Sequence, residues 1–224
     1  MLLRLASVLS REELATVRAL LARAQFVDGR LSAGAAAGRV KNNQELDKQS
    51  SELTSLNNLV MGNLVRHPDY RAGALPLKVA APYYARYQPG MHYGNHVDDP
   101  VMGDAGALYR SDVAVTIFLS APDEYDGGEL VIQTPFGESE VKLPAGDAVL
   151  YPASSLHRVN DVTRGERLVA ATWLQSIVRD PARRELLYEL NQAREKLLQS
   201  APDAPETAQV NRSYVNLIRM WSEV

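Results

Sequence analysis

The stretch that decides the fold is residues 112–120, Asp-Val-Ala-Val-Thr-Ile-Phe-Leu-Ser. Aliphatic side chains recur there at every second position, as they do on a β-strand, whose successive side chains point to opposite faces of a sheet. Other runs rich in β-branched and aromatic residues surround it: 77–87, 129–133, 139–143, 148–151 and 167–175. Turn signals separate these runs, and no helical pattern long enough for a parallel crossover lies between them. The sequence therefore predicts an antiparallel double-sheet jelly roll.

A helical region is predicted before this sheet. Ser10 stands three residues before Glu13, which is the spacing of a capping box, so we expect a helix over 11–24. Residues 28–38 are rich in Gly and Ala without a period and are predicted to form a loop. A second helix is expected from about residue 43 to just before the His-Pro pair at 67 and 68. Both helices would then precede every strand of the sheet.

After the last predicted strand the apolar period becomes helical again. Two C-terminal helices are expected, separated by a Pro-containing break at 200–205. The sequence leaves open whether they pack on the barrel or form the contact surface of a homo-oligomer. The fold is thus predicted to be α+β and mainly β, with a helical support region at 1–76, a jelly-roll domain at 77–178 and a helical extension at 179–224.

The bulk composition indicates one catalytic domain and excludes several classes of protein. The 224 residues include 46% hydrophobic and 23% charged ones, as in ordinary globular proteins that bury one core. A formal charge of -3 is far from the basic footprint of a nucleic-acid-binding protein, and no apolar run approaches the ~18 residues of a membrane span. We therefore expect a soluble, cytoplasmic protein with no nucleic-acid or membrane partner. Because the chain has no cysteine, any metal must be held by nitrogen and oxygen atoms.

The segment His96-Val97-Asp98 places an imidazole and a carboxylate two residues apart, which on an extended chain puts both on one face. His157, just after the strand expected at 148–151, is the candidate third ligand. Two histidines and a carboxylate form a facial triad that leaves three adjacent positions of an octahedral Fe(II) open. A bidentate keto acid and dioxygen would fill these positions. Zinc hydrolases can use the same ligands but normally need a general base nearby.

Arg167 follows His157 by ten residues and begins the predicted strand 167–175. A guanidinium presents a fixed fork of N–H donors that matches a carboxylate bidentately. If His157 and Arg167 lie on neighbouring strands with both side chains inward, the cation would meet the far carboxylate of 2-oxoglutarate. The sequence therefore predicts Arg167 as the anchor of this co-substrate.

These motifs resemble those of the Fe(II)- and 2-oxoglutarate-dependent dioxygenases of the prolyl 4-hydroxylase type, and within them the bacterial PKHD-type hydroxylases, including the iron-uptake-associated PiuC-like group. The resemblance covers most of the predicted barrel, in the segments 87–98, 126–130, 144–147, 157–159 and 167–173. Residues 40–43 also look like the PKHD group, and Asn42 and Asn43 could line a lid or cap a helix. Collagen-type prolyl hydroxylases usually carry lysine where this chain has Arg167, which favours the bacterial subgroup.

The resemblance implies that His96, Asp98 and His157 bind Fe(II) and are the catalytic residues, and that Arg167 anchors 2-oxoglutarate. It also implies that Tyr87 donates its hydroxyl to the co-substrate, although packing in the core would explain this residue equally well. The implied reaction uses O2 to hydroxylate a peptide, an amino-acid-like compound or an iron-uptake-related small molecule, with formation of succinate and CO2. Whether L-ascorbate is a further cofactor is left open.

Several neighbouring residues have simpler interpretations. His92 is expected to lie outside the metal-binding group, and Trp173 to be a core aromatic residue. Tyr93 could contact substrate or pack in the core. The segment 126–128, Asp-Gly-Gly, is interpreted as a hairpin turn that needs no catalytic role, and 99–108 as a loop that covers the substrate.

Two competing functions would use the same residues differently. A cupin-like metalloenzyme would hold a metal in the same barrel without 2-oxoglutarate, and Arg167 would then be structural. A metal or ligand sensor would bind without turnover and use the C-terminal helices as its partner interface.

Overall fold

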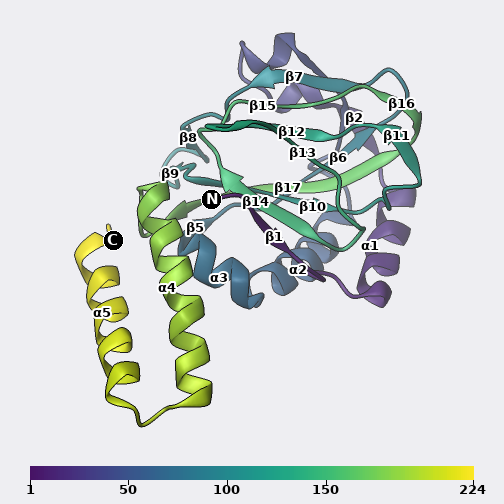
Figure 1. Ribbon diagram of the computed structural model, residues 1–224. Coiled ribbons are helices and arrows are strands. Elements are labelled where there is room, and N and C mark those ends of the chain that lie inside the picture. Colours follow the sequence, from purple (N-terminus) through teal and green to yellow (C-terminus); the bar gives the residue numbers. More distant parts are fainter.

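The computed structural model describes all 224 residues and arranges most of them in three layers. An eight-stranded sheet lies between a five-stranded sheet and the helices α1 (Arg11–Arg23), α2 (Leu53–Leu64) and α3 (Pro68–Ala74) (Figure 1). All paired strands run antiparallel. The two facing sheets form a double-stranded β-helix, so the predicted α+β, mainly β jelly roll is confirmed.

Each sheet draws its strands from distant parts of the chain. Across the eight-stranded sheet the order is β1 (Leu3–Leu5), β14 (Ala148–Pro152), β10 (Val113–Phe118), β17 (Arg167–Ser176), β6 (Tyr83–Tyr87), β4 (Gln44–Leu46) and β2 (Phe26–Asp28), and β5 (Pro76–Val79) also pairs with β17. Across the five-stranded sheet it is β13 (Gly137–Val141), β12 (Leu130–Thr134), β15 (His157–Val159), β7 (His92–His96) and β3 (Lys41–Asn42). Two small pairs complete the barrel: β11 (Tyr125–Gly127) with β16 (Val162–Gly165), and β8 (Val101–Met102) with β9 (Tyr109–Arg110).

Strand β10 contributes side chains to two separate hydrophobic cores, one on each face of its sheet. All six of its residues are buried, because the strand lies inside the eight-stranded sheet and both of its faces are covered. Val113, Val115 and Ile117 belong to the core that includes buried residues of α1, α2 and α3. Ala114 and Phe118 belong to the second core, between the two sheets. The alternation therefore separates a helix-facing surface from the barrel interior.

The N-terminal region differs from its prediction. Helix α1 begins with the expected capping box, in which Ser10 and Glu13 each accept a hydrogen bond from the other's backbone N–H. The strands β1, β2, β3 and β4, however, pair into both sheets, so the prediction that only helices precede the sheet is wrong. The second helix begins at Leu53 and not near Asn43, because residues 44–46 pair with β6 instead. Strands of two or three residues are too short to show a period.

The expected strand at 77–87 is two strands that pair with opposite ends of β17. Val79 of β5 lies opposite Leu174, whereas Tyr87 of β6 lies opposite Arg167. The chain leaves the sheet between them at Pro82, which has no N–H to donate. Residues 28–38, expected to form a loop, contain the end of β2 and two 3-10 turns, η1 (Gly29–Ser32) and η2 (Ala37–Arg39), and only 33–36 between the turns are irregular. The division of the chain at residues 76 and 178 stays a prediction.

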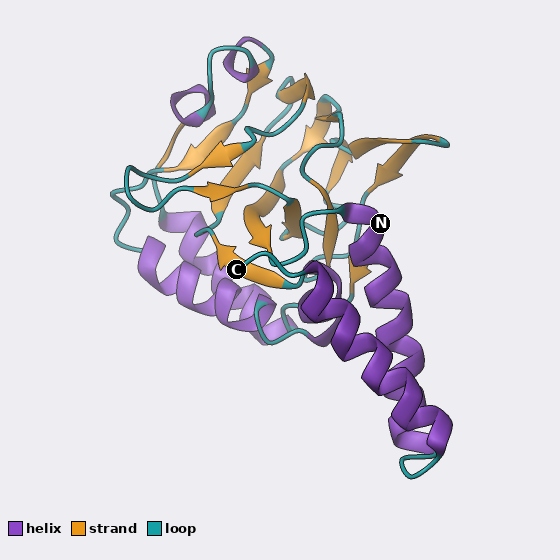
Figure 2. Cartoon of the chain, turned by 90° about the vertical axis from the view of Figure 1, so that its left-hand side faces the viewer, coloured by secondary structure: helices purple, strands orange, loops and turns teal.

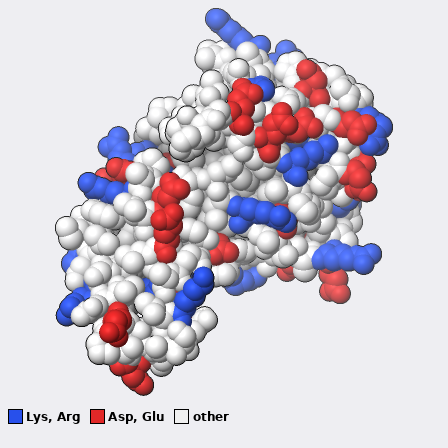
Figure 3. Space-filling model, in the orientation of Figure 1, with Lys and Arg blue, Asp and Glu red and all other residues white.

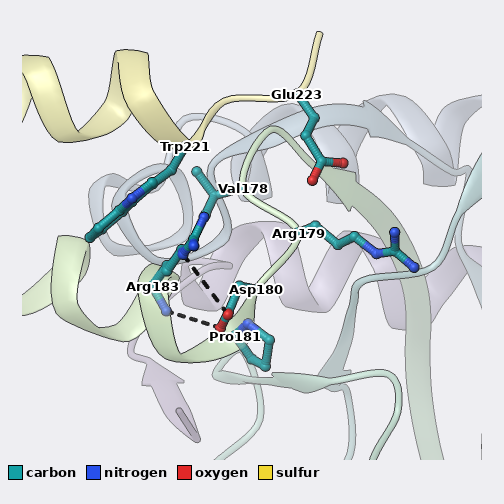
Figure 4. A pocket seen from close by; sticks show the side chains of 7 residues that line it. All are labelled: Val178, Arg179, Asp180, Pro181, Arg183, Trp221 and Glu223. Carbon is teal, nitrogen blue, oxygen red and sulfur yellow. Dashed lines mark hydrogen bonds and ion pairs between the residues drawn. The ribbon is translucent and has the colours of Figure 1, made fainter.

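The two expected C-terminal helices are present as α4 (Pro181–Ser200) and α5 (Pro205–Trp221), and they extend from the barrel as a hairpin (Figures 1 and 2). A groove of about 420 Å³ lies where the hairpin joins the barrel (Figure 4). There the Arg183 guanidinium lies 5.2 Å from the Trp221 ring centre, and the Asp180 carboxylate caps α4. The groove thus lies at the junction between the hairpin and the barrel. Oligomerisation through the hairpin stays a prediction.

Charged side chains of both signs are mixed over the face drawn in Figure 3, and neither sign dominates it. Among the helices, none is both long enough and apolar enough to span a membrane. This face therefore indicates no partner by its charge.

Strand β1 provides a test of the fold, because no strand was predicted at residues 3–5 and yet this strand contributes to the helix-facing core. Leu5 is fully buried, whereas Leu2 is 41% exposed. We expect Leu5→Ala to lower the free energy of unfolding by about 2–5 kcal/mol, since it leaves a cavity in the helix-facing core. The matched Leu2→Ala should change it by no more than about 0.5 kcal/mol. Urea unfolding measures both, and equal effects would contradict the observed packing of β1.

Candidate active site

The pairing of β7 with β15 brings the two candidate histidine ligands together. His96 and His157 are direct partners across these strands, and their ring centres are 4.2 Å apart. Asp98 follows β7 and turns its carboxylate toward both rings. Its Oδ1 lies 3.9 Å from Nε2 of His96 and 3.7 Å from Nε2 of His157. One ligand atom from each residue thus falls within 4.8 Å of the others, and all three side chains are at most 8% exposed.

Backbone contacts aim both imidazoles in the same way. Nδ1 of His96 is 2.8 Å from the carbonyl oxygen of Gly94, and Nδ1 of His157 is 2.9 Å from that of Ser155. An Nδ1–H that donates to a carbonyl leaves the lone pair on Nε2, which here points toward Asp98. Each histidine is therefore oriented as a metal ligand by a carbonyl two residues before it.

The electrostatics of this group fit a bound cation. Burial lowers the pKa of His96 to about 3, and the neighbouring His157 imidazole acts in the same direction, so the His96 ring is neutral. Burial raises the pKa of Asp98, although His157 opposes this shift, and Oδ2 of Asp98 is buried without a hydrogen-bond partner. Two neutral imidazoles and a buried carboxylate are the donor set that suits a divalent transition metal.

Two tyrosine side chains pack against the imidazole rings of His96 and His157. Tyr93 stacks on His96 with 3.6 Å between ring centres and 13° between planes. Tyr151 meets His157 edge-on at 5.3 Å. This contact limits the movement of the His96 ring, and Tyr93 also lines the cavity described below, so a contact with substrate stays a prediction.

Arg167 lies inside the barrel with 1% exposure, and two of its nitrogens, Nε and Nη1, are buried without a hydrogen-bond partner. Its guanidinium lies 4.9 Å from the ring centre of Tyr87 and 5.7 Å from that of Phe118. Rings stabilise a cation through their faces but do not satisfy its N–H donors. A buried guanidinium with free donors fits a carboxylate ligand.

The expected strand arrangement of His157 and Arg167 is wrong. His157 lies on β15 of the five-stranded sheet and Arg167 on β17 of the eight-stranded sheet, so they are on facing sheets and not on neighbouring strands. Strand β16 and its turn lie between them in the chain, which the ten-residue spacing alone did not reveal. Both side chains still point into the barrel.

One cavity of about 560 Å³ joins the candidate triad to Arg167. Tyr87 also lines it, as does Trp173, which packs against the core between the sheets but leaves its Nε1 buried without a partner. Trp173 is therefore not only the core aromatic that the sequence predicted. The pair of strands β8 and β9 places Met102 and Tyr109 on another part of the wall; Met102 lies within the segment 99–108 that was expected to cover the substrate, and Tyr109 follows it directly.

This cavity has a polar wall, of which the sequence indicated only Asn43, as a possible lid residue, and missed Lys41 and Glu45. Lys41, Asn43 and Glu45 all line it and are all buried, because alternate residues of an extended segment face the same way. Nζ of Lys41 lies 2.5 Å from Glu45 and donates to Ser32 at 3.0 Å. Asn42 faces outward and donates to the carbonyl of Gly90, so only the second asparagine borders the cavity. Because a helix was expected from residue 43, the sequence did not indicate that these alternate residues share one face.

His92 stands apart from the candidate metal group, as predicted. Its Nδ1 lies 2.9 Å from the carboxylate of Asp161, and its side chain is 40% exposed. Although it shares β7 with His96, it belongs to no group of metal-ligating side chains.

Comparison with known proteins agrees with this geometry. Residues 82–175 match the model of the 2OG-Fe(II) oxygenase superfamily, and residues 181–223 match that of the PKHD-type hydroxylase C-terminal domain. PKHD-type hydroxylases from Thioalkalivibrio sulfidiphilus and Hyphomonas neptunium are 55% and 47% identical to this chain, with complete coverage of both sequences in each case. The chain is a PKHD-type hydroxylase. The enzyme thus belongs to the family that its motifs resemble, and the α4–α5 hairpin is the part that matches the PKHD C-terminal domain.

Solved structures show that the fold of this hydroxylase is shared more widely. A Trichoplax adhaerens prolyl hydroxylase in complex with a peptide fragment of hypoxia inducible factor is 15% identical, with a TM-score of 0.57 over 78% of this chain and 83% of that one. HygX from Streptomyces hygroscopicus, with nickel, 2-oxoglutarate and hygromycin B bound, is 17% identical, with a TM-score of 0.52 over 79% and 84%. At these identities the likeness shows the fold alone.

The two histidines of β7 provide a matched test of the metal site. We expect His96→Ala to weaken Fe(II) binding by about 100-fold or more, because the substitution removes a ligand as well as its orientation. His92→Ala removes a histidine from the same strand without touching the group and should leave the affinity within about twofold. Anaerobic titration calorimetry measures both affinities. Similar losses in the two variants would argue against the assigned ligands.

Proposed function

We propose that this hydroxylase uses Fe(II) held by His96, Asp98 and His157, and 2-oxoglutarate anchored by Arg167, to insert one oxygen atom of O2 into a C–H bond of its substrate. The second oxygen atom enters succinate as 2-oxoglutarate loses CO2, so the atoms balance. The observation that carries this proposal is the cavity in which a buried group of two histidines and a carboxylate faces a buried guanidinium with unpaired donors.

The protein's own residues then have separate tasks. Three ligands on one side of the metal leave adjacent positions for the keto acid and O2, and the bound Fe(II) supplies the oxidative chemistry. Arg167 pairs with the distal carboxylate and thereby fixes which way the keto acid enters. Tyr87, directly opposite Arg167 in the sheet, keeps its ring beside the guanidinium and its hydroxyl available to the co-substrate. The apolar barrel walls keep bulk water away.

The substrate is proposed to be a small molecule or peptide with charged or hydrogen-bonding groups. The support is the polar wall, which offers a cation from Lys41, a carboxylate from Glu45 and an amide from Asn43 within one face. Lys41 and Glu45 pair with each other, whereas Oδ1 of Asn43 is buried without a partner, so a purely apolar substrate would leave that oxygen uncompensated at a cost in binding. Peptide and amino-acid-like compounds carry such groups, whereas a connection with iron uptake is supported by the resemblance alone.

Arg167 separates the proposal from its competitors. We expect Arg167→Ala to raise the KM for 2-oxoglutarate by about 100-fold or more, because the distal carboxylate would be buried without its partner. Arg179→Ala removes an exposed arginine outside this cavity and should leave the KM unchanged. The measurement is O2-dependent formation of succinate by the Fe(II)-loaded protein across candidate substrates.

Each competing function predicts a different outcome of this assay. A cupin-like metalloenzyme would turn over its substrate equally well in the wild type and in Arg167→Ala. A metal or ligand sensor would bind metal but consume no O2 with any substrate. Either result would overturn the proposed function.

A further inference from the structure

A second polar group without a partner lies beside Arg167: the phenol hydroxyl of Tyr125. The side chain of Tyr125 is fully buried, and its hydroxyl has no hydrogen-bond partner. The residue lies on β11, 42 positions before Arg167, and no motif interpretation gave it a role. A buried hydroxyl that stays unpaired destabilises the fold, so its position needs a physical reason.

Tyr125 and Arg167 pack on the same glycine. A Cβ atom at Gly128 would lie 3.0 Å from Cδ of Arg167 and 3.2 Å from Cε2 of Tyr125, closer than most real Cβ contacts. Gly128 also has a φ of 65°, in the left-handed region that favours glycine. The interpretation of residues 126–128 as a hairpin turn is wrong, because Asp126 and Gly127 belong to β11 and pair with β16 across a register shift. Gly128, which follows β11, instead lets the tyrosine ring approach the arginine stem.

The electrostatic contact between the two side chains agrees with this packing. Burial raises the pKa of Tyr125, and the nearby positive charge of Arg167 opposes that shift. On its other side the ring is covered by Lys142, whose Nζ lies 4.1 Å from the ring centre and donates to the Tyr125 carbonyl oxygen. The ring therefore has little freedom to turn its hydroxyl away from the guanidinium.

We propose that Tyr125 is a positioning residue for the co-substrate, whose hydroxyl oxygen accepts from the Arg167 guanidinium and keeps its remaining N–H donors aimed into the cavity. Arg167 lines the cavity and Tyr125 does not, so Tyr125 acts through the arginine. The phenol supplies the acceptor that the flanking rings of Tyr87 and Phe118 do not. This inference rests on the proposed function, because it concerns the distal carboxylate of 2-oxoglutarate.

The test compares Tyr125→Phe with Tyr70→Phe. Tyr70 is also fully buried with an unpaired hydroxyl, but it lies in the helix-facing core, away from Arg167. Anaerobic calorimetry on the Fe(II)-loaded full chain gives the affinity for 2-oxoglutarate and for 2-oxopentanoate, which has the same carbon chain without the distal carboxylate. We expect Tyr125→Phe to weaken 2-oxoglutarate binding about tenfold, since the arginine loses one charge-assisted hydrogen bond. Its affinity for 2-oxopentanoate, and both affinities of Tyr70→Phe, should stay within about twofold of the wild type.

Urea unfolding of the metal-free variants shows whether a loss of binding follows from a loss of stability. Tyr125→Phe should remain folded under the binding conditions, because the loss of one hydrogen bond removes only a small part of the stability of a domain. Unchanged 2-oxoglutarate affinity in Tyr125→Phe would overturn the inference, as would equal losses for the two keto acids or a loss that follows instability. Failure of the wild type to bind 2-oxoglutarate at all would instead overturn the proposed function itself.

Discussion

The pairing register of β7 with β15 is the constraint on which the candidate site depends. It sets His96 opposite His157, and because side chains alternate along a strand, a slip of one residue would turn one imidazole out of the barrel. The apolar partners of these strands oppose such a slip, since Val159 and Ile132 are buried in the core between the sheets. The stability of the barrel and the geometry of the metal ligands therefore have the same physical origin.

The eight-stranded sheet also keeps Arg167 away from solvent. Its outer face is covered by helices, so β17 can carry Leu174 toward one core and Arg167 into the other. Burying a guanidinium among rings is costly unless a ligand pairs with it. Burying Leu174 and its neighbours in the helix-facing core helps to offset that cost, and in the free protein part of it remains as unsatisfied N–H groups.

The sequence predicted those site residues whose type alone indicates their chemistry. It did not predict the features that depend on contacts between distant parts of the chain. His96, Asp98 and His157 could be found because few residue types bind metal without cysteine. The polar wall around Lys41 and Glu45 could not, because a helix was expected across a segment whose strands are only two or three residues long. Likewise, the ten-residue separation of His157 and Arg167 could not show that their strands belong to facing sheets.

The two hydrophobic cores differ in their buried polar atoms that lack a hydrogen-bond partner. Tyr70 leaves a single hydroxyl unpaired in the helix-facing core, where it is an isolated cost. Around the cavity, by contrast, Asp98, Trp173 and Arg167 all have unpaired atoms, and these include both an anion and a cation. Opposite charges that face one cavity and yet remain unpaired with each other are suited to a ligand set that carries both signs, a metal cation bound together with a dicarboxylate. The barrel interior is thus less well satisfied than the helix-facing core because its polar groups await partners from outside the chain.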